Sequence, residues 1–176
     1  FTPDGHWKEP GGYHNYPVSK LIEAALMLEN NGYQIFNQYP ILLKASYVML
    51  KYSFPDLTAS AFGDTGRPRQ SMECLESAIL MADRYQLPIL PDLLNAAMIM
   101  EQAGQYDRSK SGLTGLLCYL PELPKVKSVN DHLWNRSEQL DFASCYLQRN
   151  GIDPQNGLMC VVQGATYNHN HSNGMS

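Results

Sequence analysis

The stretch "VSKLIEAALMLENNG", residues 18–32, contains the clearest secondary-structure signal in this chain. Its apolar residues recur at the spacing of one face of a helix, at Leu21, Ala24, Ala25 and Leu28. Pro17 directly precedes the run and suits the first position of a helix, where its missing N–H leaves no bond unmade. Residues 30–32, Asn-Asn-Gly, tolerate the left-handed backbone that ends many helices. We therefore predict a helix that begins at Pro17 and ends near Asn30.

Further helices are expected on the C-terminal side of this run. Each candidate combines apolar periodicity with a proline, serine or aspartate near its start, or with a glycine or proline after its end. The candidates are residues 39–53, 71–86, 90–104 and 111–120, and residues 137–151 could also be helical, with Gly151 after the end. No fixed sequence period supports TPR or HEAT repeats, so a toroid of helical hairpins fits better.

The end of the chain changes character. Residues 157–166, "GLMCVVQGAT", are apolar and β-branched, which is typical of a strand. In the following "NHNHSNGMS", His169 and His171 would point to the same face of a strand, because side chains alternate between faces. The sequence therefore predicts a mainly α chain. Residues 1–156 are part of an α/α toroid, and residues 157–176 are the first strands of an antiparallel β-sandwich.

Composition limits the class of protein. The 176 residues are 44% apolar and 17% charged, which suits a globular protein with one sizeable core. The formal net charge of −4 argues against a nucleic-acid-binding protein, and no apolar run approaches the ~20 residues of a membrane span. The four cysteines show no CxxC spacing, so we interpret them as buried free thiols. Residues 1–12 do not have the pattern of a signal peptide and the first residue is not Met, so we expect the chain to be a piece of a longer protein.

Polar and ionisable residues concentrate in three loops. The first is residues 4–17, "DGHWKEPGGYHNYP", in which Tyr13 and Tyr16 lie beside glycines that allow close approach of a ligand. A tyrosine can transfer a proton, although both side chains could equally cover the mouth of the toroid. His6 and His14 in the same loop are interpreted as surface residues.

The second and third loops suggest anion and metal binding. In residues 63–70, "GDTGRPRQ", Asp64 could fix the loop, whereas Arg67 or Arg69 could bind a carboxylate or sulfate in two-point contact. A His-x-His pair on a strand is a common arrangement of metal ligands. Two histidines alone do not make a metal site, and residues 169 and 171 could equally lie exposed on an edge strand.

Taken together, these motifs resemble the heparinase II/III-like family of polysaccharide lyases. Residues 4–17 resemble that family's Asp-Gly-Ser-aromatic-x-Glu-Gly-x-x-Tyr segment, and "FGDTGR", residues 62–67, is similar to a Gly-Asp loop between toroid helices. "YNHNHSNGMS", residues 167–176, is similar to the His-x-His-x-Asp-x-x-Ser motif that opens the β-sandwich.

The resemblance implies β-elimination on a uronic-acid-containing polysaccharide by a bacterial enzyme that is periplasmic or secreted. Tyr13 matches the family's catalytic tyrosine and His169 its catalytic histidine. His171 matches a ligand of a structural divalent metal, for which the resemblance implies zinc, and the other ligands would lie outside this chain. Tyr16 and Arg67 are candidates for contacts with the sugar.

Two other classes of function stay open at the level of sequence. A glycoside hydrolase on an α/α toroid would need a pair of carboxylates, for which Glu9 and Asp64 are the loop candidates. A noncatalytic glycan-binding module would use the aromatic loops to stack on sugars. Absorbance of an unsaturated product distinguishes the lyase from both.

Overall fold

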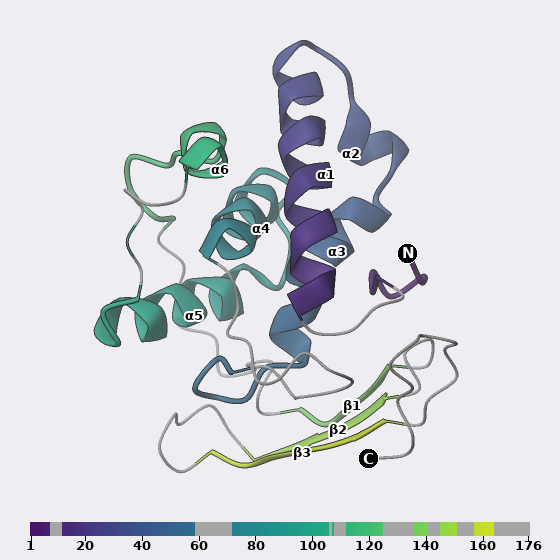
Figure 1. Cartoon of the computed structure of the whole chain (residues 1–176), viewed down its shortest axis with the longest axis vertical. Helices are drawn as coiled ribbons and strands as arrows, with labels where there is room; N and C mark the ends of the chain where they lie inside the picture. Colours follow the sequence, from purple (N-terminus) through teal and green to yellow (C-terminus); the bar gives the residue numbers. More distant parts are fainter. Residues whose placement is uncertain are drawn as a thin grey trace.

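The protein is mostly helical, with a small sheet at its C-terminal end (Figure 1). The computed structural model describes residues 1–7, 12–58, 72–105, 107, 112–124, 136–140, 145–150 and 157–163. The predicted fold class, mainly α followed by antiparallel strands, is confirmed. Among the residues that the structure describes, no helix is long and apolar enough to cross a membrane. The domain boundary predicted at residue 157 stays a prediction.

Helix α1 (Gly12–Asn30) starts earlier than the sequence indicates. The prediction that Pro17 is the first helical residue is wrong, because Pro17 lies inside the helix. Proline cannot donate the hydrogen bond that the carbonyl of Tyr13 receives in an uninterrupted helix. Contacts made by His14 in the first turn hold this part of α1 in place, so tertiary structure compensates for the missing bond.

The predicted end of α1 is confirmed. Gly32 adopts a φ of +88°, which a residue with a side chain would reach only at a cost. The N–H of Gly32 donates to the carbonyl of Glu29 (3.0 Å), and the N–H of Tyr33 donates to the carbonyl of Leu28 (3.1 Å). This pair of bonds is a Schellman motif, which satisfies carbonyls left unpaired at a helix end.

Four more of the predicted helices are present, each shorter than its candidate range. They are α3 (Ile41–Lys51), α4 (Met72–Arg84), α5 (Leu90–Gln102) and α6 (Gly112–Leu117). An additional helix, α2 (Ile35–Gln38), is too short to leave a periodic signal in the sequence. Helix α4 ends before Pro88, at a turn in which Gln86 has a φ of +51°.

Helix α4 divides the helical core into two hydrophobic clusters. One lies among α3, α4 and α5, and the other lies among α1, α2, α3 and α6 with Met81 of α4. Leu75, Ile79 and Leu93 are fully buried in the first cluster, and Ile22 and Leu26 are fully buried in the second. Because α3 and α4 contribute to both clusters, they are the shared centre of the helical part.

The sheet consists of three short antiparallel strands in the order β1-β2-β3. They are β1 (Glu138–Leu140), β2 (Cys145–Arg149) and β3 (Met159–Gln163). The register pairs Glu138 with Leu147 and Tyr146 with Val162. The strand predicted within residues 157–166 is confirmed.

The helix predicted for residues 137–151 is wrong, since β1 and β2 lie there. Leu147 is buried, while Tyr146 and Gln148 beside it are exposed, which is the alternation of a strand. Glu, Gln, Leu and Arg have high helix propensity, and pairing with β3 outweighs that local preference.

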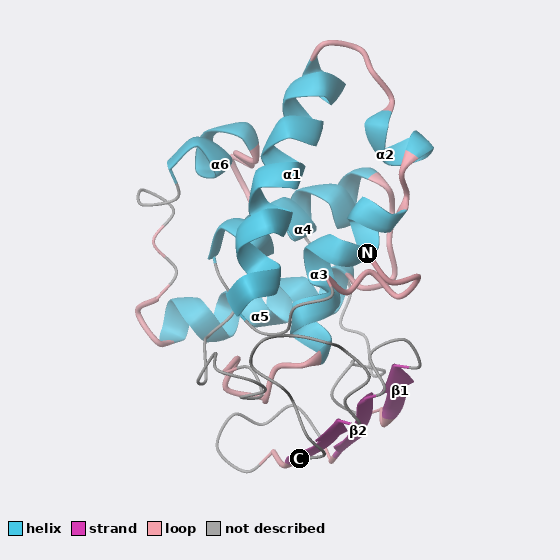
Figure 2. Cartoon of the chain, turned by 45° about the vertical axis from the view of Figure 1, so that its right-hand side comes forward, coloured by secondary structure: helices cyan, strands magenta, loops and turns pink. Residues whose placement is uncertain are grey.

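The sheet lies below the helices, at the end of the bundle where α1 begins and α3 ends (Figures 1 and 2). Two polar contacts join the two parts. The ammonium group of Lys51, the last residue of α3, pairs with the carboxylate of Glu138. The guanidinium of Arg149 donates to the carbonyl of Lys51 and to the carbonyl of Arg136 (2.9 Å). Arg149 therefore satisfies a carbonyl at the helix end that has no partner within the helix.

The contact between Arg149 and α3 is testable through stability. We expect Arg149→Met to lower the free energy of unfolding by about 1–3 kcal/mol, because it leaves the Lys51 carbonyl without its charged donor. Urea denaturation measures the change. Lys20→Met removes an exposed cation that pairs with Glu23 on the same helix, and it should change stability by less than about 0.5 kcal/mol. Equal losses in the two variants would contradict the role of Arg149.

Candidate functional site

Two histidines and a tyrosine form a buried cluster where the N-terminal segment meets α1 and α3. His6 and His14 are each 1% exposed, and their stacked rings have centroids 5.4 Å apart. The ring of Tyr52, just after α3, lies 5.2 Å from that of His6. The prediction that His6 and His14 are surface residues is therefore wrong. Packing against α3, which follows much later in the sequence, encloses them.

The imidazole of His14 connects three segments through two hydrogen bonds. Its Nδ1 accepts the backbone N–H of Trp7 at 2.9 Å, and its Nε2 lies 3.0 Å from the carbonyl oxygen of Ala45 in α3. A carbonyl can only accept, so Nε2 carries the proton and Nδ1 is the acceptor. The neutral ring satisfies both partners. Protonation of Nδ1 would place two donors against each other and break the bond to Trp7.

The N-terminal segment lies directly on α3. The Thr2 hydroxyl contacts Asp4, and the Thr2 side-chain oxygen accepts the backbone N–H of His6 at 3.0 Å. Gly5 adopts a φ of +92°, and a Cβ at this position would lie 2.7 Å from the backbone carbon of Lys44. The ammonium of Lys44 donates to the carbonyl of Pro3 at 3.1 Å. Only glycine fits this approach, so Gly5 determines how closely the segment packs.

Burial keeps both histidines neutral. Loss of solvent, together with the neighbouring His14, lowers the pKa of His6 to about 3, whereas Asp4 opposes the change. Burial also lowers the pKa of His14 to about 4, against the effect of its bond to the Ala45 carbonyl. Neither ring can therefore supply a proton as an imidazolium near neutral pH. Their role is to hold the first turn of α1.

Tyr13 precedes His14 and belongs to this first turn, although its side chain lies outside what the structure describes. The turn is at the end of α1 that faces the sheet (Figures 1 and 2). The hydrogen bonds of His14 therefore fix the backbone from which Tyr13 projects, which is what a proton-transferring side chain requires.

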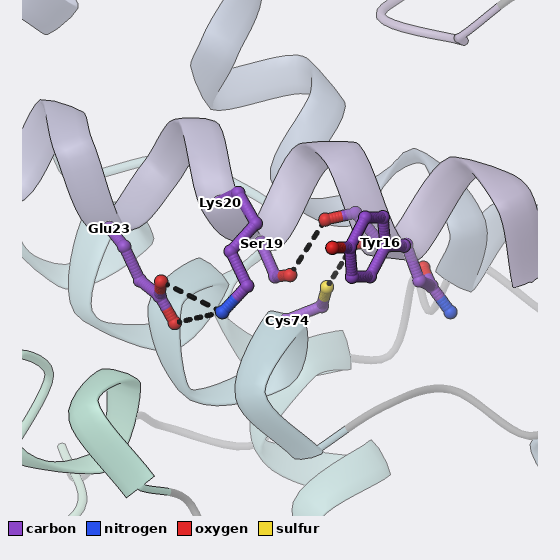
Figure 3. Close-up of polar contacts among 6 residues, drawn as sticks. Tyr16, Ser19, Lys20, Glu23 and Cys74 are labelled. Atoms are coloured by element: carbon purple, nitrogen blue, oxygen red, sulfur yellow. Dashed lines mark hydrogen bonds and ion pairs between the residues drawn. The ribbon is translucent and has the colours of Figure 1, made fainter.

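Tyr16 lies one turn further along α1 and is 72% exposed, so its phenol is open to a ligand (Figure 3). Its carbonyl accepts the hydroxyl of Ser19 at 2.9 Å, and Lys20 pairs with both carboxylate oxygens of Glu23 nearby. Figure 3 also shows Cys74 reaching from α4 toward α1, where its thiol donates to the carbonyl of Asn15 at 3.6 Å. The start of α1 is thus tied to α4 as well as to α3.

The cysteines are structural rather than reactive in the helical part. Cys74 and Cys118 are buried free thiols, as predicted, whereas Cys160 in β3 is exposed, so the prediction is wrong for that residue. Burial, followed by the charge of Glu76, raises the pKa of the Cys118 thiol to about 12. A thiol with such a pKa stays protonated and is a poor nucleophile.

Several predicted site residues lie outside the described residues. These are Arg67, His169 and His171, together with the carboxylate candidates Glu9 and Asp64. The structure therefore leaves their roles as predictions. Within the described ranges, no group of three His, Cys, Asp or Glu side chains could hold a metal ion.

Sequence reasoning missed the histidine cluster because its signal is tertiary. His6 and His14 stand eight residues apart in a loop rich in glycine and aromatic residues, a context that fits exposure as well as burial. The one available hint was the scarcity of charge around His14, where "YHNYP" has no ionised neighbour. That hint indicates burial weakly and says nothing about the partner at Ala45.

We expect the stability of the fold to fall steeply in acid. Each histidine has a folded-state pKa below its ordinary value of 6.5, so its contribution is complete above pH 6.5 and is lost as the pH falls toward 4 and then 3. In that window each ring contributes up to about 1.4 kcal/mol per pH unit to the slope of unfolding free energy. Denaturation across pH 7 to 4 measures the slope. His6→Phe keeps an aromatic ring and should reduce the slope by roughly half, and an unchanged slope would rule out His6 as a source.

Two glycine variants test the packing of the N-terminal segment. Gly5 and Gly32 both have positive φ, but nothing lies within 4 Å of a Cβ at Gly32. Gly32→Ala should cost about 1–2 kcal/mol from backbone strain alone, whereas Gly5→Ala should cost roughly 1–3 kcal/mol more because the new methyl meets the α3 backbone. Chemical denaturation of both variants gives the difference, and equal losses would contradict the contact with Lys44.

Comparison with known proteins places this architecture in a family. The family model described as "Endo-acting ulvan lyase 2nd domain" matches residues 3–121, well over half of the chain. The match covers the segment that carries the histidine cluster and all of α1 to α6. Comparisons with curated proteins and with solved structures found no match. The predicted kinship with polysaccharide lyases is confirmed at this coarser level, while the heparinase II/III-like assignment stays a prediction. The chain belongs to the family of the second domain of endo-acting ulvan lyases, a polysaccharide lyase domain.

Proposed function

We propose that this protein takes part in cleaving a uronic-acid-containing polysaccharide by β-elimination. The observation that carries the proposal is the family match, which includes the N-terminal loop and the first turn of α1. Because the family description names ulvan lyases, ulvan is the first polymer to test. The fixed helical turn at Tyr13 gives the proposal a structural basis.

The reaction removes a proton and a leaving group from adjacent carbons. A base takes the C5 proton of the uronate, the C4–O bond breaks, and a C4=C5 double bond forms. The departing glycosidic oxygen receives a proton from an acid. Negative charge develops on the uronate carboxylate during this step, so cationic or hydrogen-bond-donating groups near it lower the barrier.

Tyr13 and His169 are the proposed acid–base pair. Support for Tyr13 comes from its position, since His14 ties this turn to Trp7 and to Ala45 of α3. A tyrosine held in this way can exchange a proton at its phenolic oxygen without first ordering its backbone. His6 and His14 do not compete for the role, because burial lowers the pKa of each well below neutrality.

Tyr16 and Arg67 are the proposed contacts with the sugar. The support for Tyr16 as a sugar contact is that its side chain is exposed and lies about one turn from Tyr13 on the same helix. An aromatic ring that is open to solvent can pack against a sugar face and donate its hydroxyl. Arg67 could bind a carboxylate or sulfate through two parallel N–H groups.

A structural metal at His171 is part of the proposal, and zinc is the proposed ion. Imidazole is a suitable zinc ligand, and the remaining ligands would come from residues beyond those described or beyond this chain. We further propose a periplasmic or secreted location, because a polymeric substrate is accessible there.

A spectroscopic assay tests the function. The full-length protein is incubated with ulvan, heparan sulfate or alginate, and the ultraviolet absorbance of the new C4=C5 bond is followed. We expect a rise with one polymer, and Tyr13→Phe should slow it by about 10²- to 10⁴-fold because the phenolic proton is lost. Tyr33→Phe, at the other end of α1 and exposed, is the matched control and should keep the wild-type rate.

The outcomes separate the alternatives. Normal activity of the Tyr13→Phe variant would show that Tyr13 is not a catalytic residue. New reducing ends without ultraviolet absorbance of a C4=C5 bond would show that the protein is a hydrolase and not a lyase. Binding without either product would indicate a glycan-binding module. If the protein keeps full activity after dialysis against a chelator and elemental analysis finds no zinc, the proposed metal site at His171 is wrong. Activity confined to the cytosol would contradict the proposed location.

A further inference from the structure

A pocket of about 340 Å³ lies where the helices meet the sheet, and its lining residues are not those of the histidine cluster. Its walls come from the second half of α3, from the connection between α4 and α5, and from the residues leading into β1. The lining residues are Tyr47, Lys51, Pro88, Ile89, Arg136, Ser137 and Glu138. We propose that this pocket is a subsite for one acidic sugar unit of the polysaccharide, an inference that rests on the proposed function.

The charges of the pocket suit an anionic ligand with hydroxyl groups. Lys51 and Arg136 bring two positive charges, and Glu138 brings one negative charge, so the lining has a net positive charge. Guanidinium and ammonium groups bind carboxylate or sulfate, and charge-assisted bonds of this kind are the stronger ones. The carboxylate of Glu138 can accept hydroxyl protons of the same sugar.

The part of the lining formed by Ile89 and Tyr47 is continuous with the hydrophobic core. Ile89 is 9% exposed and belongs to the core cluster of α3, α4 and α5, and Tyr47 packs against that cluster. Burial and the charge of Glu138 raise the pKa of Tyr47, so its hydroxyl stays protonated and available as a donor. A volume of this size lies at the lower end of the range for small-ligand sites. Apolar walls with a few convergent polar groups are typical of such sites.

The walls of the pocket are held in register by the contacts that join helices and sheet. The pairing of Lys51 with Glu138 and the bond from Arg149 to the Lys51 carbonyl fix α3 against β1. The carbonyl of Arg136 accepts a hydrogen bond from the guanidinium of Arg149 at 2.9 Å, which holds the backbone of Arg136 beside β2. The pocket is therefore preformed by backbone and core packing.

Ile89 gives a site-specific signal for binding. The full-length protein is labelled at isoleucine methyl groups and titrated with ulvan oligosaccharides, with the same oligosaccharides after chemical desulfation, and with neutral glucan oligosaccharides. We expect the Ile89 methyl resonance to shift and saturate with the acidic oligosaccharides, while that of Ile22, buried in the other cluster, stays in place. Loss of the shift on desulfation identifies sulfate as the group bound, and its retention identifies the carboxylate.

Arg136→Gln tests the chemistry of the pocket. Arg136 is exposed, so the substitution should leave the fold intact, and we expect the apparent affinity at Ile89 to weaken by about tenfold through loss of a charged hydrogen bond. Lys20→Gln removes the same net charge from the exposed face of α1 and is the matched control, with unchanged affinity. Tyr47→Phe keeps the ring and should give a smaller loss.

The subsite and the catalytic proposal fail in different ways. An Ile89 resonance that does not respond, or equal affinities in Arg136→Gln and wild type, overturns the subsite even if the absorbance assay shows lyase activity. A saturable, Arg136-dependent shift without any unsaturated product overturns the lyase and leaves an acidic-glycan site. A shift that is equal for neutral and acidic oligosaccharides overturns the charge-based recognition proposed here.

Discussion

The two hydrogen bonds of His14 determine how the first part of this chain is assembled. One bond joins α1 to the N-terminal segment at Trp7, and the other joins α1 to α3 at Ala45. The bond to Trp7 requires an unprotonated Nδ1, and burial beside His6 keeps the His14 ring neutral. The same bonds make it possible for α1 to extend ahead of Pro17, where a proline would otherwise mark the beginning of the helix.

Helix α3 carries this constraint across the molecule. The carbonyl of Ala45 accepts a hydrogen bond from His14, and Gly5 packs closely against the backbone of Lys44. Its last residue, Lys51, contacts Glu138 of the sheet through its side chain and Arg149 through its carbonyl. One short helix therefore positions both the turn that contains Tyr13 and the sheet. A displacement of α3 would change the two regions together, which is why stability and site geometry are coupled here.

The sequence predicted the elements with a repeating local pattern and missed those that depend on distant partners. Most of α1 was predicted from the apolar spacing between Leu21 and Leu28 and from Gly32 after its end. The strand β3 was predicted from its β-branched residues. Residues 137–151 have helix-forming side chains, and only pairing with β3 makes them strands. The burial of His14 depends on Ala45, 31 residues away, for which no local pattern exists. The candidate residues His169, His171 and Arg67 came from motif resemblance, and the described part of the structure leaves them as predictions.

The buried histidine cluster and the pocket beside β1 differ in their exposure to solvent. The histidine cluster is dry, and its rings are uncharged because solvation of an imidazolium is lost there. The pocket beside β1 is lined by Lys51, Arg136 and Glu138, and Lys51 pairs with Glu138 in its wall. A polymer with many negative charges would meet resistance at a dry site and would be attracted at a wet, cationic one. In this proposal the bonds of His14 fix the turn that contains Tyr13, and the pocket beside β1 supplies the charged groups that would recognise the polymer.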